Sequence, residues 1–110
     1  MFIMSITYDD FAKLDIRIAK IISVEKIPGK TKIVKGVIDI GSEKRELIIG
    51  GADFYQPEEL VGKTVVAVIN LESKKIAGIE SNAMLLAADV NDKPFWLTVI
   101  DDVPLGTKIK

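Results

Sequence analysis

Alternating hydrophobic and polar positions dominate the first half of the chain and predict β-strands. In residues 15–26 the apolar side chains fall at every second position, at Ile16, Ile18, Ile22 and Val24. This period of two is typical of a strand with one buried face. Lys20 interrupts the series and Ile21 lies on the opposite face, so we expect a β-bulge near Ala19 and Lys20. Residues 15–26 are therefore predicted to form one long, bent strand.

Four more strands are expected downstream. Pro28 and Gly29 form a turn, and residues 33–40 and 45–49 make two strands joined by a hairpin loop at residues 41–44. The apolar runs at residues 63–71 and 83–90 are nearly continuous, which is typical of strands buried on both faces. Such strands are expected in a closed barrel.

Two short helices and an apolar tail complete the prediction. Residues 8–14 are expected to form a helical turn with Phe11 facing inward. Residues 55–62 carry Pro57 early, acidic residues in the first turn and Gly62 at the end, a pattern that favours a short helix. The tail contains an apolar segment at residues 94–99, and residues 107–110 close the chain.

The order of these elements is that of an OB-fold. Three strands, a helix and two strands make a five-stranded Greek-key barrel, which commonly binds oligonucleotides on one face. We therefore expect an all-β protein in which residues 1–110 are one domain. The barrel is predicted at about residues 15–90, with a C-terminal extension at about 91–110.

Composition restricts the possible functions. The 110 residues contain no histidine and no cysteine, the side chains most used for acid–base, thiol and transition-metal chemistry near neutral pH. No glycine-rich nucleotide-binding motif and no nucleophile elbow follows a strand. We therefore expect no catalytic activity, no cofactor and no metal. The net charge of -1 excludes a globally basic nucleic-acid binder, although a local basic face remains possible.

The sequence also gives expectations about location. With 48% apolar and 28% charged residues, the chain has the composition of a globular protein. No apolar run approaches the roughly 20 residues of a membrane span, so no membrane partner is expected. The first ten residues lack the features of a signal peptide, which favours the cytoplasm. Whether Met1 or Met4 is the start stays open.

Candidate binding residues lie mainly in two loops. Isolated surface lysines often serve only to solvate a loop, but lysines of two adjacent loops on an OB face can bind phosphates. Arg17, on the first strand, can point to that face or pair with an acid such as Asp39. The loop candidates, taken in chain order, are Lys30, Lys32, Asn70, Lys74, Lys75, Ser81, Asn82 and Met84.

Each remaining candidate has a structural alternative. Asn70 and Asn82 can satisfy backbone groups of turns, and the Ser81 hydroxyl, expected at the barrel mouth, can do so or reach a phosphate or ribose. Met84 can belong to the core or pack under a base. Phe54 and Tyr55 are expected to pack in the core or against the helix. Because aromatic residues make up only 6% of the chain, recognition of the RNA backbone is favoured over base stacking.

Four blocks of sequence resemble a known family. They are DIRIAKI (15–21), VIDIG (37–41), YQPEELVGKTVVAVINL (55–71) and GIESNAMLLAA (78–88). Together they resemble the tRNA-binding domain at the C-terminus of methionyl-tRNA synthetases, which also occurs as free-standing dimeric tRNA-binding proteins and is similar to a domain of synthetase-associated cytokine-like proteins. In the family's motifs, Pro28 and Lys32 match the first turn, and Ser81 and Met84 match the last block.

The resemblance implies an OB-fold that binds folded tRNA as a homodimer, with methionyl-tRNA synthetase as a possible partner. Such a protein would be an accessory like a synthetase beta subunit. Some relatives of the fold are chaperones for unfolded or export-bound polypeptides, and this is the alternative function. The tail residues Phe95, Trp96, Val99, Val103 and Leu105 are expected to hold the dimer, because a barrel closed by five strands cannot cover them all.

Overall fold

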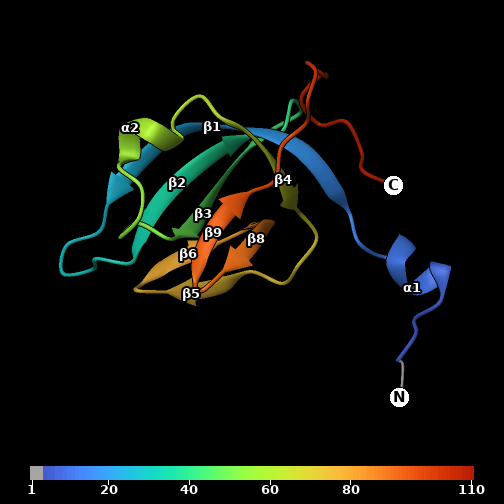
Figure 1. The fold of residues 1–110 in the computed structure, drawn as a ribbon, viewed down its shortest axis with the longest axis horizontal. Coiled ribbons are helices and arrows are strands. Elements are labelled where there is room, and N and C mark those ends of the chain that lie inside the picture. The colour runs from blue at the N-terminus through green and yellow to red at the C-terminus, as the bar shows by residue number, and fades with distance from the viewer. Residues whose placement is uncertain (1–3) are drawn as a thin grey trace.

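A nearly closed antiparallel barrel forms the body of the molecule. The computed structural model describes residues 4–110 (Figure 1). Met1, one of the two possible start residues, lies outside the described residues. Five strands follow the order β3-β2-β1-β4-β7. Their bounds are β1 (Ile16–Lys26), β2 (Ile33–Asp39), β3 (Lys44–Gly50), β4 (Thr64–Val68) and β7 (Met84–Leu85). This confirms the all-β OB-like fold and the predicted positions of the first four strands.

β1 is the strand that bends the sheet into a barrel. Its first half pairs with β4 and its second half with β2, and Figure 1 shows it as a long arc over the other strands. The bulge lies between Ile21 and Ser23, so its prediction near Ala19 and Lys20 was wrong. No bulge is needed at Lys20, because it shares the outer face with Ile16 and Ile18 and is simply left uncovered.

Two hydrophobic clusters explain why β1 and β4 are buried on both faces. Inside the barrel, residues such as Ile21, Leu47 and Val65 are completely buried. On the outer face, a second cluster of Ile16, Ile18, Val66 and Val68 is covered by side chains from the N-terminal helix, the segment after β7 and the tail, namely Phe11, Leu86, Val99, Leu105 and Ile109. The continuous apolar pattern of β4 therefore reflects the barrel interior on one side and, on the other, an outer face that other parts of the chain cover.

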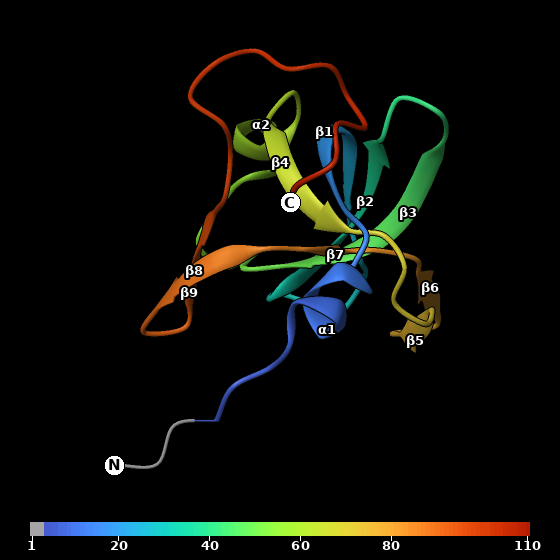
Figure 2. The ribbon, with the colours of Figure 1, turned by 90° about the vertical axis from the view of Figure 1, so that its right-hand side faces the viewer.

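The tail is fixed to β1 by backbone hydrogen bonds. The amide of Ile18 donates to the Thr107 carbonyl at 2.9 Å, and the amide of Gly106 donates to the Ile18 carbonyl at 2.7 Å. Figure 2 shows how the tail passes over α2 and returns to the front of β1. Residues 106–109 thus pair with the edge of β1 that β4 leaves free.

The connection after β4 contains more regular structure than predicted. The sequence suggested a loop, but β5 (Lys74–Ile76) and β6 (Ile79–Ser81) form a hairpin within it. The single strand expected at residues 83–90 is also divided into β7 and β8 (Ala87–Val90), and β8 pairs with β9 (Lys93–Trp96). The division falls at Leu86, where the chain stops pairing with β4 and starts pairing with β9. The Leu86 amide donates to the Val66 carbonyl, and the Leu86 carbonyl accepts from the Leu97 amide.

Both helices are short and begin at capped ends. In α1 (Tyr8–Ala12) the Thr7 hydroxyl accepts from the Asp10 amide at 3.1 Å, and Phe11 faces the outer cluster as predicted. α2 (Pro57–Leu60) has Gln56 as its N-cap residue, and its Leu60 packs in the barrel core. Within residues 4–110, no helix has the length and hydrophobicity needed to cross a membrane.

Candidate nucleic-acid interface

The β1–β2 loop presents two of the predicted lysines. Lys30 and Lys32 are exposed on a turn that Gly29 enters with a positive φ of 77°, a conformation that glycine adopts without steric cost. The Ala52 amide donates to the Lys32 carbonyl at 3.1 Å and ties the loop to the end of β3. The backbone of this loop is therefore held while its lysine side chains remain in solvent.

The β5–β6 hairpin presents Lys74 and Lys75 at the same end of the barrel. Ile33 of β2 pairs with Gly50 of β3, β6 runs antiparallel beside β3, and Ile76 of β5 pairs with Ile79 of β6. The strands thus follow the order β2, β3, β6 and β5, and three strand spacings span about 14 Å. Figure 1 shows both turns at the same side of the molecule. All four lysines are exposed and lie outside the ion pairs formed within residues 4–110.

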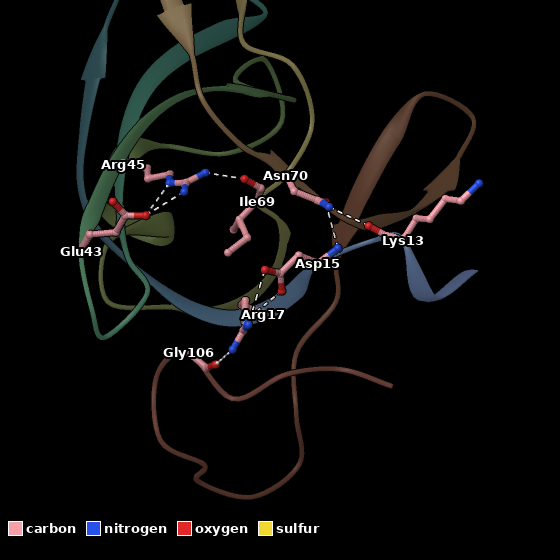
Figure 3. Close-up of polar contacts among 8 residues, drawn as sticks. All are labelled: Lys13, Asp15, Arg17, Glu43, Arg45, Ile69, Asn70 and Gly106. Carbon is pink, nitrogen blue, oxygen red and sulfur yellow. Dashed lines mark hydrogen bonds and ion pairs between the residues drawn. The ribbon is translucent and has the colours of Figure 1, made fainter. Parts of the chain in front are cut away.

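Arg45 holds both ends of the segment that carries this hairpin. Its guanidinium donates to the carbonyl of Ile69, before the segment, and to the carbonyl of Asn82, after it. Glu43 accepts from the same guanidinium at 2.7 Å (Figure 3). From the sequence, Arg45 was predicted only to be part of a strand. The one sequence feature that indicates its role is its position two residues after a glutamate in a hairpin. Arg45 is therefore a positioning residue for Lys74 and Lys75.

Ser81 closes the barrel between β3 and β6. Its hydroxyl accepts from the Ile48 amide at 3.0 Å and donates to the Ala83 carbonyl at 3.3 Å, and it is part-buried. The hydroxyl therefore satisfies backbone groups, which was one of the two alternatives, and its contact with a phosphate or ribose stays a prediction. The signal was weak because a serine in a loop gives no indication that a neighbouring strand has an unpaired amide.

Replacement of Ser81 by alanine is expected to lower the stability of the protein. The change leaves the Ile48 amide without its acceptor, which costs about 1–3 kcal/mol for a buried donor. Urea unfolding followed by the fluorescence of Trp96 measures the difference. Ser73→Ala is the matched control, since Ser73 is exposed on the same connection. Equal stability of the two variants would contradict the structural role of the Ser81 hydroxyl.

Arg17 and Asn70 lie at the opposite end of the barrel from the lysines. Arg17 donates to Asp15 at 2.6 Å and to the Gly106 carbonyl at 3.0 Å, so the alternative of pairing with an acid is confirmed, with Asp15 in the place of Asp39. The hydrogen bond from Arg17 holds the pKa of Asp15 below its ordinary value of 3.8. The length of β2, about 20 Å, separates this group from the β1–β2 loop. The structure therefore does not bring Arg17 together with the lysines.

Asn70 satisfies backbone groups at both of its amide atoms. Its Oδ1 accepts from the Asp15 amide at 2.8 Å, and its Nδ2 donates to the Lys13 carbonyl at 2.6 Å. Figure 3 shows the side chain bridging the end of β4 and the start of β1. The structural alternative for Asn70 is therefore confirmed, and its contact with tRNA stays a prediction.

Asn82 and Met84 border the hairpin. The backbone amide of Asn82 donates to the Glu46 carbonyl at 3.0 Å, and its side-chain Nδ2 donates to the Glu80 carbonyl at 3.5 Å. Met84 is 46% exposed, which excludes the core alternative and leaves its thioether available to a ligand. Both residues lie at the β7 end of the hairpin segment.

Comparison with known proteins places the chain in a family. The family described as a putative tRNA binding domain matches residues 16–108, nearly the whole chain. The chain belongs to this tRNA-binding domain family. The match includes both lysine-bearing segments and the tail that pairs with β1.

Relatives within the family include parts of much longer proteins. The chain is 49% identical over 105 residues to the methionine–tRNA ligase of Thermotoga maritima, a match that covers 96% of this chain and 17% of the ligase. The chain thus spans about one sixth of the length of that enzyme.

Two solved structures are similar over their whole length. The MetRS related protein from Pyrococcus horikoshii has a TM-score of 0.91 and 35% identity, covering 98% of this chain and 100% of that one. The chaperone CsaA from Bacillus anthracis has a TM-score of 0.89 and 27% identity, covering 97% and 100%. The similarity to both structures therefore includes the barrel, the N-terminal helix and the tail.

No metal centre is visible at this face. In the described part of the chain, no group of three or more Asp, Glu, His or Cys side chains is placed to hold a metal ion.

Proposed function

We propose that this protein is a non-catalytic, structure-specific tRNA-binding protein. The observation that carries the proposal is the placement of Lys30, Lys32, Lys74 and Lys75 at one end of the barrel, where they border the outer face of β2 and β3. In OB-folds this face, with the loops beside it, binds oligonucleotides. Ammonium groups without carboxylate partners attract phosphates and release counterions when they bind them.

The mode of binding follows from what these segments offer. Lysines at both margins of the β2–β3 face suit two nearby stretches of RNA backbone, whose spacing depends on the fold of the RNA. The main-chain hydrogen bonds to Lys32 and the anchoring by Arg45 fix the spacing of the two margins. A rigid spacing selects a folded RNA over a flexible strand.

The role proposed for tRNA binding is accessory to methionyl-tRNA synthetase. Support comes from the identity with one part of a methionine–tRNA ligase and from the full-length similarity to a MetRS related protein. In this role the chain acts in the cytoplasm, like a synthetase beta subunit, and helps the enzyme to hold its tRNA. Aminoacylation of tRNA by a synthetase, measured with and without this protein, tests the role: a lower KM for tRNA is expected.

A chaperone-like function is the second candidate, favoured by the similarity to CsaA. An open cleft of about 670 Å³ beside α2, with Leu60, Trp96 and Val99 among its lining residues, offers apolar surface for a polypeptide. Salt separates the two functions, because binding to phosphates weakens steeply with salt whereas apolar binding does not. The chaperone function would be favoured if the protein suppresses the aggregation of an unfolded protein even at high salt and shows no salt-sensitive binding of tRNA.

Pairing of two copies is also part of the proposal, and two of the five tail residues expected to carry it, Phe95 and Val103, are exposed. The other three are partly buried by the chain itself, since Trp96 packs against the barrel core and Val99 and Leu105 pack on the outer cluster. The exposed apolar side chains of the tail include Phe95, Leu97, Ile100 and Val103, at 45%, 42%, 101% and 36%, and Ile6 on the N-terminal arm is 70% exposed. They form the apolar surface available for a second copy.

We expect the full chain to be a dimer and Leu97→Asp with Ile100→Asp to shift it toward the monomer. A buried carboxylate at an apolar interface is strongly unfavourable. Light scattering gives the mass, and circular dichroism shows whether the variant keeps its strands. Point changes are preferred to removal of the tail, because residues 106–109 pair with β1. A monomeric wild-type chain would contradict the pairing.

A further inference from the structure

Three aromatic rings converge on one lysine next to the β1–β2 loop. The Nζ atom of Lys93 lies 5.9 Å from the centre of the Phe54 ring, 5.5 Å from that of Tyr55 and 5.1 Å from that of Phe95. These are cation–π distances. We call these four side chains the aromatic cluster. It joins the segment after β3 to the β8–β9 hairpin, which lies below the barrel in Figure 1.

Anchoring of the hairpin does not require the two phenylalanines. The Tyr55 hydroxyl donates to the Pro94 carbonyl at 2.6 Å. Pro94 also packs directly on Gly51, where an added Cβ would lie 2.5 Å from the proline Cγ. By contrast, Phe54 and Phe95 remain 44% and 45% exposed. The prediction that Phe54 packs in the core or against the helix was therefore wrong, because Tyr55 takes that place.

A basic cleft continues from the aromatic cluster to the β1–β2 loop. The cleft, of about 330 Å³, has Tyr55 at one side and Lys26, Lys30, Thr31 and Gln56 among its lining residues. Within residues 4–110, neither these two lysines nor Lys93 takes part in an ion pair. The surface therefore alternates exposed aromatic faces with unpaired ammonium groups and hydrogen-bonding side chains.

We propose that the aromatic cluster and the adjoining cleft bind an unpaired stretch of the RNA chain. A basic groove that follows the backbone, combined with aromatic faces on which bases stack, is the arrangement by which proteins hold single-stranded nucleic acid. Bases stack on Phe54 and Phe95, while Lys93, Lys26 and Lys30 contact phosphates. This inference rests on the proposed tRNA binding and adds to it a second, stacking subsite beside the lysines of the β2–β3 face.

The test compares two RNAs of equal length, a tRNA with its unpaired 3′ end and a blunt-ended RNA duplex, on the full protein. For Phe54→Leu with Phe95→Leu, we expect the affinity for tRNA to fall roughly fivefold or more while the affinity for the duplex is unchanged. Leucine keeps apolar volume without a stacking face. The salt slope of tRNA binding should stay that of the wild type, whereas Lys93→Met should flatten it by roughly 0.7 to 0.9.

A fluorescent base analogue in the unpaired segment adds a direct readout, since stacking on a ring quenches it. We expect quenching with the wild type and none with the double phenylalanine variant. Melting temperature and light scattering confirm that the variant keeps its fold and its association state. If tRNA binds the double variant as tightly as the wild type, or if both RNAs lose affinity equally, the stacking subsite is wrong while tRNA binding stands. If the wild type binds no tRNA, the proposed function itself fails, and the subsite with it.

Discussion

Simultaneous replacement of Lys32, Lys74 and Lys75 by alanine is expected to flatten the salt dependence of tRNA binding. Each lysine that contacts a phosphate releases about one counterion, so the slope of log affinity against log salt should fall by roughly 0.7 to 0.9 per lysine. The three side chains are exposed at the two margins of the β2–β3 face. Preference among different tRNAs should change little, because phosphate contacts carry no base information.

Lys13→Ala is the matched control for this variant. Lys13 lies beside α1 and pairs with Asp10 at 3.3 Å, far from the β1–β2 loop in Figure 1, so its removal should leave the slope unchanged. Titrations of tRNA at several salt concentrations measure both variants. If the triple variant keeps the slope of the wild type, the two margins do not bind phosphates and the chaperone alternative gains support.

Gly41→Ala is expected to destabilise the protein by about 3 kcal/mol or more. Gly41 has a φ of 88°, and an added Cβ would lie 2.6 Å from the Leu105 carbonyl oxygen. Backbone strain at a positive φ costs about 1 kcal/mol or more, and the collision also pushes the tail away from the end of β2. Loss of the tail would uncover Ile16, Ile18 and Val66 in the outer cluster, which adds a hydrophobic cost.

Gly62→Ala separates strain from collision. Its φ of 87° is nearly the same, but nothing lies within 4 Å of the added Cβ, so this variant should lose only about 1–2 kcal/mol. Urea unfolding of the two variants and the wild type gives the difference. Equal losses would show that contact between the tail and residue 41 contributes nothing to stability.

The barrel could be predicted because its strands carry regular patterns. Alternation placed the first three strands to within one residue, and the continuous apolar run at residues 63–71 identified β4 as buried on both faces. The run at residues 83–90 did not, since Met84 and residues 88–90 are exposed. The same runs could not tell which face meets the barrel interior. Lys20 illustrates this: its face is apolar at Ile16 and Ile18 because side chains remote in sequence, among them Leu105 and Ile109 of the tail, cover them.

The site could be predicted only in part, for a similar reason. Lysines in loops are recognisable from the sequence, and the structure brings those of two loops to one end of the barrel. The positions of Arg17 and Asn70, at the opposite end, depend on the strand lengths. The roles of Ser81 and Arg45 depend on which backbone groups of a neighbouring strand remain unpaired. Pairing between distant segments has no local signature, so these roles needed the structure.

Competition between a folded tRNA and a poly-pyrimidine strand of the same length tests the central claim most directly. At one fixed salt concentration near physiological, the unlabelled strand and the unlabelled tRNA each compete for protein bound to labelled tRNA. A rigid face with lysines at two margins should bind the folded tRNA more tightly, since only a folded RNA holds two stretches of backbone at a fixed spacing. Equal competition by the two RNAs would contradict structure-specific tRNA binding.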